Sequence, residues 1–340
     1  MKTRGLCIAA IFLLLSAVLG AESLKVVAFP VWSGLKDSGF FTAREYEEPD
    51  ERAFRLDIMK SGLQALNPDL AMLTGLNGLP KTAEELSEEL GYNGMYSVNK
   101  GGVRIGVVGL PWNLREGSVL LVREEYDFQP LESKRFSGLF IKNTLSMGVK
   151  TAPQIMGGKI TLAGREVYVF TVHWIGGPAH PEKDLQDLTK QYADGNLEGD
   201  AYIKAVRESV RRSEESLSLV YSTLGFINSL AGEAPVILAG SLNITPDSRE
   251  MEALSQAGFK DAWEKGSGSG YTLDGQRNLN IRRFYGSDER DRRERLDYVL
   301  YRGEGITVRK AELVFDSPTF GVHPSDRFGV YAHFDVQSEE

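Results

Sequence analysis

Four short polar clusters in this sequence carry side chains that could act on a phosphate ester. They are residues 171–174 (Thr-Val-His-Trp), 240–246 (Gly-Ser-Leu-Asn-Ile-Thr-Pro), 295–300 (Arg-Leu-Asp-Tyr-Val-Leu) and 325–330 (Ser-Asp-Arg-Phe-Gly-Val). Histidine and asparagine can donate hydrogen bonds, arginine can grip a phosphate with two parallel bonds, and aspartate can orient water or hold a cation. Because α/β enzymes place such groups at strand ends, we expect the clusters to form one site.

The candidate site residues in these clusters are His173, Asn243, Asp297, Asp326 and Arg327. Each also has a structural explanation. A histidine at a strand end is often satisfied by its surroundings, an asparagine shortly before a proline favours a turn, and an aspartate in an alternating strand can pair with a nearby arginine. No cluster is specific alone, so the functional interpretation depends on their order along the chain.

Strand-like and helix-like segments alternate around these clusters. Continuous or alternating apolar runs predict strands, and apolar residues three and four apart predict helices. Two mixed sheets packed face to face, with helices outside, would satisfy this α/β pattern. Strands are expected at 24–29, 70–73, 103–110, 118–122, 138–142, 159–162, 166–172, 235–239, 295–301 and 328–336, and helices at 53–66, 82–90, 201–231 and 248–257.

The N-terminal residues have the order of a secretory signal peptide. Lys2 and Arg4 precede a short, almost wholly apolar run that ends in small residues. The run is too short to span a bilayer, which takes about 20 residues. We therefore expect a signal peptide at 1–21, a single domain at 22–340, and export to the periplasm or the cell exterior. The alternative is an uncleaved N-terminal anchor.

Composition limits the remaining possibilities. Cys7 is the only cysteine, so the mature chain could form neither a disulfide nor a thiolate metal site. The net charge of −8 argues against bulk electrostatic binding to nucleic acid. Arginines between residues 282 and 295 alternate with carboxylates, which is typical of a solvated loop. No segment after the apolar N-terminal run is apolar enough to cross a membrane.

Taken together, the four clusters resemble the motifs of the endonuclease/exonuclease/phosphatase superfamily. That superfamily includes DNA-repair endonucleases, DNase I-like nucleases, inositol polyphosphate 5-phosphatases and neutral sphingomyelinases. The resemblance spans residues 24–336 and implies a four-layer α/β sandwich of two mixed β-sheets flanked by helices. It also implies catalytic roles for the retained positions His173, Asn243, Asp297 and Asp326, with Asp297 orienting His173 or Asn243.

Four other motif positions depart from the family pattern. Pro30 replaces the asparagine that ends the first strand, and Gly75 replaces the glutamate that is the main metal ligand. Ser241 replaces the aspartate of the Gly-Asp-aromatic-Asn motif, and Arg327 replaces the histidine of the Ser-Asp-His motif. Glycine has no ligand atom, serine is no base at neutral pH, and arginine cannot exchange a proton because its pKa is above about 12.

The retained side chains predict phosphate recognition rather than rapid hydrolysis. His173, Asn243 and Arg327 could bind an anionic ester, whereas Asp326 alone is a weak metal ligand because Mg²⁺ usually needs one or two carboxylates. We therefore expect a catalytically impaired, phosphate-ester-binding protein that needs no cofactor. Its ligand is expected to be a lipid headgroup, a nucleotide or a nucleic acid.

The alternative is an active, Mg²⁺-dependent phosphodiesterase or phosphatase that takes its missing ligands from elsewhere. Asp69, Asn77 and Glu294 are the candidates, although none is in register with the family motifs. Residues 270–274 resemble a loop of sphingomyelinase-like members, so such an enzyme would be sphingomyelinase-like or nuclease-like.

Overall fold

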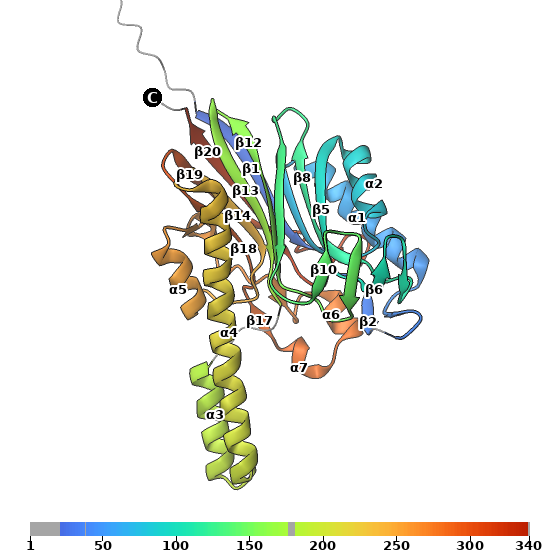
Figure 1. The fold of residues 1–340 in the computed structure, drawn as a ribbon, viewed down its shortest axis with the longest axis vertical. Helices are drawn as coiled ribbons and strands as arrows, with labels where there is room; N and C mark the ends of the chain where they lie inside the picture. The colour runs from blue at the N-terminus through green and yellow to red at the C-terminus, as the bar shows by residue number, and fades with distance from the viewer. Residues whose placement is uncertain (1–20, 38, 176–180, 339–340) are drawn as a thin grey trace, which may run out of the picture.

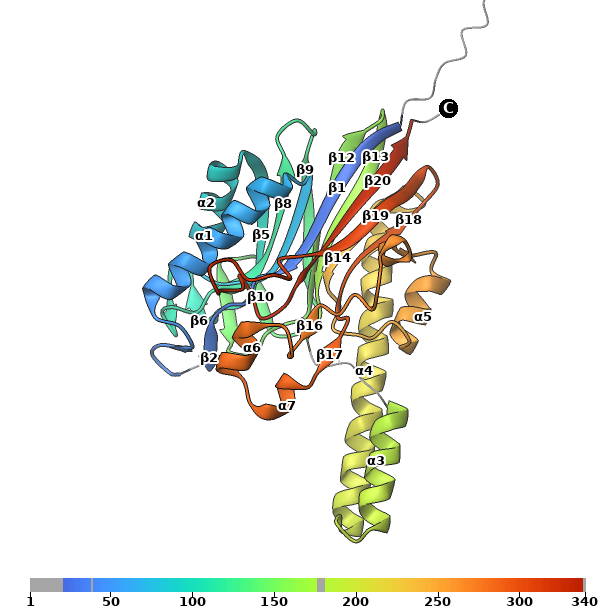
Figure 2. The same ribbon diagram turned by 180° about the vertical axis from the view of Figure 1, so that it is seen from behind.

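The computed structural model describes residues 21–37, 39–175 and 181–338. Two six-stranded sheets pack face to face, and helices cover their outer faces, so the fold has four layers in the order helix, sheet, sheet, helix (Figure 1 and Figure 2). This arrangement confirms the four-layer α/β sandwich that the family resemblance implies.

The first sheet contains the N-terminal and C-terminal strands of the described chain. From edge to edge its strands are β19 (Ile306–Val314), β20 (Gly329–Gln337), β1 (Ala21–Pro30), β4 (Leu70–Leu76), β8 (Glu116–Arg123) and β5 (Tyr92–Lys100). β1 and β4 run parallel, and the other neighbours run antiparallel, so the sheet is mixed.

The second sheet is built from the middle of the chain. From edge to edge its strands are β15 (Lys260–Asp261), β18 (Asp297–Arg302), β14 (Val236–Ser241), β13 (Arg165–His173), β12 (Gln154–Leu162) and β9 (Gln129–Arg135). β13 and β14 run parallel, whereas the β12–β13 pair is antiparallel as expected. Ala163 and Gly164, which join β12 to β13, both have positive φ, the conformation of a tight hairpin turn.

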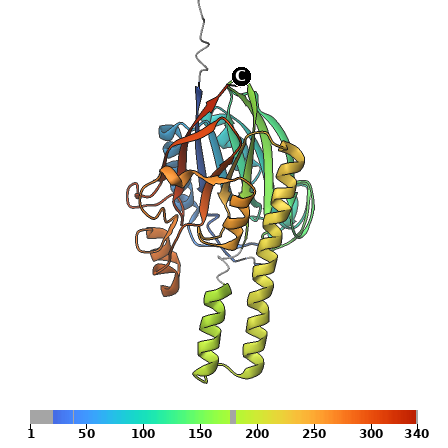
Figure 3. The same cartoon turned by 90° about the vertical axis from the view of Figure 1, so that its left-hand side faces the viewer.

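Helices cover the outer face of each sheet. α1 (Pro49–Leu66) and α2 (Lys81–Leu90) lie on the first sheet, and α4 (Gly199–Ala231) and α5 (Arg249–Gln256) lie on the second (Figure 1). The N-terminal half of α4 extends past the end of the sandwich, where α3 (Pro181–Ala193) packs beside it (Figure 3).

Short elements gather at the end of the sandwich where the sequence places the candidate residues. A small sheet has the order β10 (Leu139–Ile141), β11 (Leu145–Gly148), β6 (Gly102–Ile105) and β7 (Val108–Leu110). The others are the pair β2 (Leu35–Asp37) and β3 (Arg44–Glu45), the pair β16 (Leu273–Asp274) and β17 (Arg293–Glu294), α6 (Leu279–Phe284), α7 (Ser287–Arg290) and a 3₁₀ turn at Ala262–Lys265.

Alternation along β1 shows how the layers are held together. Leu24, Val26 and Ala28 point into the core between the sheets. Val27 and Phe29 point the other way, into the core beneath α1 and α2. Since successive side chains of a strand face opposite sides, a strand that is apolar at every position must be covered on both faces. The continuous apolar run at 24–29 therefore required helices outside the sheet.

Most of the expected elements are present, with two kinds of difference. The strand expected at 103–110 is two strands, β6 and β7, because a turn at Gly106 and Val107 reverses the chain. β5, β9 and β19 were not expected. Four of the clustered arginines are ion-paired to carboxylates; these are Arg283, Arg292, Arg293 and Arg295. The segment is not wholly a solvated loop, because it contains short helices and a strand and the Arg295 side chain is only 11% exposed.

The signal peptide expected at 1–21 lies outside the described residues, except for Ala21, which opens β1. Within the described part of the chain, no helix is both long and apolar enough to span a membrane.

Candidate functional site

The predicted site residues meet at one end of the two sheets. Pro30 lies beside Thr74 where β1 and β4 end, and His173 lies beside Ser241 where β13 and β14 end. Ser241 is in turn opposite Asp297, the first residue of β18. The register of three strand pairs thus brings clusters that are far apart in sequence to one edge, as strand-end chemistry requires.

A buried pair of hydroxyls joins the two sheets at this edge. Thr74 Oγ1 lies 2.8 Å from Ser241 Oγ, and both side chains are buried. One hydroxyl donates to the other, so Ser241 takes part in a hydrogen bond between the sheets. Nothing in this contact activates Ser241 as a base or nucleophile.

Ser325 fastens the loop before β20 to the end of β1. Its hydroxyl donates to the Pro30 carbonyl oxygen at 2.6 Å and accepts from the backbone N–H groups of Trp32 and Arg327, each at 3.2 Å. The Ser325 side chain is fully buried, so this network fixes the neighbouring Asp326 and Arg327.

Arg327 pairs with Asp297. Arg327 Nη1 lies 3.3 Å from Asp297 Oδ1 and 3.5 Å from Oδ2, and Asp297 is fully buried. The sequence predicted that Asp297 would orient His173 or Asn243. Instead, the hydrogen bonds that His173 and Asn243 make go to other groups, Asn99 and the Trp174 carbonyl.

His173 is a neutral side chain in this environment. Asn99 Nδ2 lies 3.3 Å from His173 Nδ1. Burial lowers the pKa of His173 to about 3, and the positive charge of Arg327 contributes to the shift. A neutral imidazole can donate one hydrogen bond and accept another, but it cannot supply a positive charge to a phosphate near neutral pH.

Asn243 turns the chain after β14 and leaves one polar atom unused. Its φ of 54° is left-handed, a conformation that asparagine tolerates better than most residues. Its Nδ2 donates to the Trp174 carbonyl at 2.5 Å. Within the part of the chain that the structure describes, the buried Oδ1 has no hydrogen-bond partner. This oxygen is a buried acceptor at the edge of the strand ends.

Asp326 accepts from a neutral donor, Tyr285, and burial raises its pKa against the opposing charge of Arg327. Tyr285 donates its phenolic O–H to Asp326 Oδ2 at 2.8 Å, and Ser325 Oγ lies 3.3 Å from Oδ1. Tyr285 follows α6, in the arginine-rich segment for which sequence analysis expected no functional role.

Sequence analysis missed a carboxylate and an amine at this site. Glu116, the first residue of β8, lies opposite Lys100, the last residue of β5, with Oε2 3.8 Å from Lys100 Nζ. Burial raises the pKa of Glu116, and the charge of Asp326 adds to this shift, while Lys100 and the Ser33 hydroxyl oppose it. Both residues lie where strands end beside the predicted clusters, which is the one signal that could have found them.

The backbone at Gly75 leaves space that a larger side chain could use. Gly75 forms a bulge between β4 and β8 with φ of +72°, and an added Cβ would have the Val31 carbonyl oxygen, at 3.8 Å, as its nearest described neighbour. Gly240 is different, because its Cβ would lie 2.2 Å from the Val172 carbonyl oxygen. Gly240 therefore permits the close approach of β13 and β14, whereas Gly75 opens the cleft.

Comparison with known proteins agrees with this geometry. The model of the Endonuclease/Exonuclease/phosphatase family matches residues 39–326, most of the chain. The chain belongs to this family. A search of curated protein sequences gives no match.

Solved structures of the endonuclease/exonuclease/phosphatase family share the fold. TDP2 from D. rerio, complexed with a single strand DNA product, is 17% identical with a TM-score of 0.60, over 92% of this chain and 98% of that one. An endonuclease/exonuclease/phosphatase from Bacteroides vulgatus is 14% identical with a TM-score of 0.59, over 93% and 99%. At these identities the likeness shows the fold alone.

Family members generally use a divalent metal, and the residues present here fit that ion poorly. Among the described residues, no group of three or more His, Cys, Asp or Glu side chains could hold a metal. The charge of Asp326 acts on Glu116, the amine of Lys100 acts on Glu116, and the guanidinium of Arg327 acts on Asp326. Two fixed cations so close to the donors oppose the binding of a third.

The three replacement ligands considered from the sequence do not improve that fit. Asp69 precedes β4, at the opposite end of the strand from Gly75, and accepts from the Lys25 backbone N–H at 2.7 Å. Glu294 pairs with Arg292 at 2.6 Å. Asn77 lies close to Gly75, but its amide is engaged by the backbone of Asn113 and Arg115.

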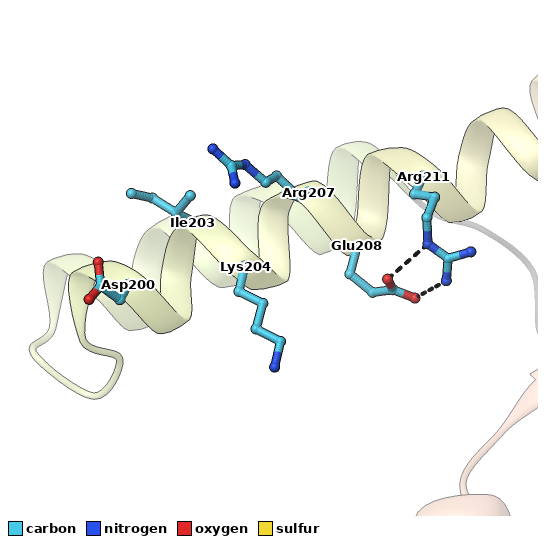
Figure 4. Close-up of a pocket in the computed structure, with 6 residues that line it drawn as sticks. All are labelled: Asp200, Ile203, Lys204, Arg207, Glu208 and Arg211. Atoms are coloured by element: carbon cyan, nitrogen blue, oxygen red, sulfur yellow. Dashed lines mark hydrogen bonds and ion pairs between the residues drawn. The ribbon is translucent and has the colours of Figure 1, made fainter.

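A groove lies between α1, α2 and the small sheet. It has a volume of about 540 Å³, and its lining includes Arg52 of α1, Lys81 of α2, Asn77 after β4, and Val107 and Trp112 of the small-sheet segment. Its size suits part of a small organic ligand. A second depression lies on the projecting part of α4, and all six residues that line it come from that one helix (Figure 4). It has no link to the strand ends.

Proposed function

We propose that this protein binds a phosphate ester in the cleft at the strand ends and hydrolyses it slowly or not at all. The proposal rests on the contacts made by the residues that replace the family's motif residues. Ser241 is bonded to Thr74, and Arg327 is paired with Asp297. Both contacts stabilise the cleft without providing a general base or a metal ligand.

The charges of the cleft support binding of an anion without a metal. Arg327 and Lys100 are cations with partly exposed side chains, so both can reach a ligand. Arginine and lysine bind phosphate through charge-assisted hydrogen bonds, which are about twice as strong as neutral ones. The ligand class is a lipid headgroup, a nucleotide or a nucleic acid, and the DNA complex of the similar TDP2 structure agrees with the last.

Calorimetry in EDTA tests the proposal. Glycerophosphocholine, nitrophenyl phosphate and a short DNA oligonucleotide serve as probes, and we expect saturable binding of at least one of them. Lys100→Gln and Arg327→Lys should weaken it by about 10-fold or more, since a hydrogen bond to a charged group contributes about 1.5–3 kcal/mol. Lys310→Gln, on the exposed edge strand β19, is the matched control. Absence of binding in EDTA, together with binding that requires Mg²⁺, contradicts the proposal.

A second candidate function is an active metal-dependent phosphoesterase. The observation that favours it is the position of Glu116, close enough to Asp326 for the two carboxylates to repel each other. Turnover of bis-nitrophenyl phosphate, sphingomyelin or DNA that EDTA abolishes and Glu116→Gln reduces would establish this function. Turnover gained only when Gly75→Glu, Ser241→Asp and Arg327→His are combined supports the impaired protein instead.

We also propose that the protein is exported to the periplasm or the cell exterior. The support is the order of basic, apolar and small residues in the first 21 positions. Cell fractionation followed by N-terminal sequencing tests it. A new N-terminus near Ala21 is expected in the exported fraction, whereas an intact Met1 in the cytoplasm contradicts it.

A further inference from the structure

The small sheet turns one complete apolar face to the solvent. The register aligns Leu110, Val103, Met147 and Leu139 in one row across all four strands. Side chains of residues directly opposite one another in antiparallel strands lie on the same face. All four are exposed, from 38% for Leu110 to 59% for Val103.

A second row completes this face. It aligns Val108, Ile105, Leu145 and Ile141, one on each strand. We call the two rows the apolar sheet face. The residues between the rows point the opposite way, and two of them, Arg104 and Ser146, are buried against the body of the protein. The sheet is thus covered on its polar side and uncovered on its apolar side, the reverse of an ordinary surface sheet.

Aromatic side chains extend the apolar sheet face. Trp112 follows β7 and is 69% exposed. Its backbone N–H donates to the Phe41 carbonyl at 2.9 Å, so the segment with the exposed Phe40 and Phe41 lies next to Trp112. Soluble proteins rarely expose so many large apolar residues together unless the surface binds something.

Charge identifies the kind of surface that this face fits. The two segments that form the small sheet, residues 101–115 and 137–153, contain two arginines and two lysines but no aspartate or glutamate, in a chain whose net charge is −8. Lys142 and Lys150 are exposed, one beyond each end of β11. Aliphatic and aromatic side chains bordered by lysine are the chemistry of a protein surface that rests on anionic phospholipid.

We propose that the apolar sheet face docks the protein on an anionic phospholipid membrane. Its aliphatic rows enter the boundary of the acyl chains, Trp112 lies at the headgroup level, and Lys142 and Lys150 contact the lipid phosphates. Gly101 alone separates β6 from Lys100 at the end of β5. Docking therefore brings the cleft to the level of the headgroups. The docking does not depend on the proposed function. The further idea that the bound ester is a lipid headgroup does rest on the proposed function.

Co-sedimentation with vesicles tests the docking. Vesicles of phosphatidylcholine with phosphatidylglycerol are expected to bind the protein more tightly than phosphatidylcholine alone, and salt should weaken the difference. The double variant Ile105→Glu and Ile141→Glu should lower the affinity at least 10-fold, because each buried aliphatic side chain contributes well over that factor. The double variant Lys142→Glu and Lys150→Glu should lower the affinity for anionic vesicles by more than about fivefold per position. Its affinity for phosphatidylcholine vesicles should not change.

The matched control carries the same kind of change on a different exposed surface. Ile203 and Val210 lie on the projecting half of α4 and are 48% and 41% exposed. Ile203→Glu with Val210→Glu should bind vesicles like the wild type. All variants change exposed side chains, so unaltered circular dichroism is expected to confirm that they fold.

Three results would overturn the docking proposal. The first is an equal loss of vesicle binding in the control. The second is a concentration-dependent dimer that Ile105→Glu and Ile141→Glu dissociate, without vesicle binding by the wild type, because a second copy would then cover the face. The third is loss of vesicle binding in Arg327→Lys with retention in the apolar double variant, because the cleft would then hold the lipid. Vesicle binding without ester binding in calorimetry refutes the proposed function alone.

Discussion

The ion pair between Arg327 and Asp297 allows a quantitative test of the candidate site. Asp297 is fully buried, and the Arg327 side chain, 21% exposed, lies against it at 3.3 Å. Removing one partner of a buried ion pair costs about 3–5 kcal/mol, because the remaining charge has neither water nor a counter-charge. Since water can partly replace the exposed guanidinium, we expect Arg327→Ala to lower the free energy of unfolding by about 3 kcal/mol.

A double-mutant cycle separates this cost from the loss of other contacts. Asp297→Asn removes the charge at nearly constant size, and Arg327, which water reaches, should tolerate the change at about 1 kcal/mol. Arg327→Ala in the Asp297→Asn background should then cost about 2 kcal/mol less than in the wild type, because no buried charge is stranded. Urea unfolding followed by tryptophan fluorescence measures each value. With a slope of about 3 kcal/mol per molar urea, Arg327→Ala shifts the midpoint by about 1 M.

The reasoning fails if Arg327→Ala costs less than about 1 kcal/mol, or if the two single changes add without coupling. Either result would mean that Asp297 is satisfied by other groups. Arg327 would then have no structural part in the site.

Three further predictions concern His173, Gly240 and Gly75. The pKa of His173 falls to about 3 on folding, so between about pH 6.5 and pH 3 the unfolded chain binds a proton that the folded chain does not. The free energy of unfolding should therefore fall by up to about 2 kcal/mol from pH 7 to pH 5. The same urea titration should show a smaller fall for His173→Gln. Gly240→Ala, whose Cβ would lie 2.2 Å from a carbonyl oxygen, should cost more than about 3 kcal/mol in thermal unfolding, whereas Gly232→Ala, with open space around it, should cost about 1 kcal/mol. Gly75→Glu should fold with a loss of about 1–2 kcal/mol from its left-handed backbone, and calorimetry should detect Mg²⁺ binding that the wild type lacks.

The sequence predicted the convergence of the site because strand ends are local features. The apolar runs that end near Phe29 and Ala239 mark where buried strands stop, and the polar residues after them can only lie at the sheet edge. Parallel pairing of β1 with β4 and of β13 with β14 then brings those edges together. The order of the four clusters added the family, and with it the arrangement of the sheets.

Pair partners could not be predicted, because they depend on strand pairing within a sheet and on packing between the sheets. Glu116 and Lys100 belong to strands whose sequences give weak or partial signals, since β5 reads Tyr-Asn-Gly-Met-Tyr-Ser-Val-Asn-Lys and lacks an apolar run. The contact between Thr74 and Ser241 crosses from one sheet to the other. Its existence follows from the distance between the layers, which periodicity does not specify.

Three of the residues that replace the family's motif residues make contacts within the site. These contacts indicate whether the site is damaged or reorganised. Pro30 has no amide hydrogen to donate, but its carbonyl accepts from Ser325, which holds the loop of Asp326 and Arg327. Ser241 bonds to Thr74, next to Gly75, and Arg327 pairs with Asp297, opposite Ser241. Random loss of catalytic residues would leave buried polar groups and charges unpaired, each at a cost of about 1–3 kcal/mol or more. The replacements instead pair with neighbouring residues: Ser241 with Thr74, Arg327 with Asp297, and the Pro30 carbonyl with Ser325. This pairing supports the proposal that the site was reorganised for binding.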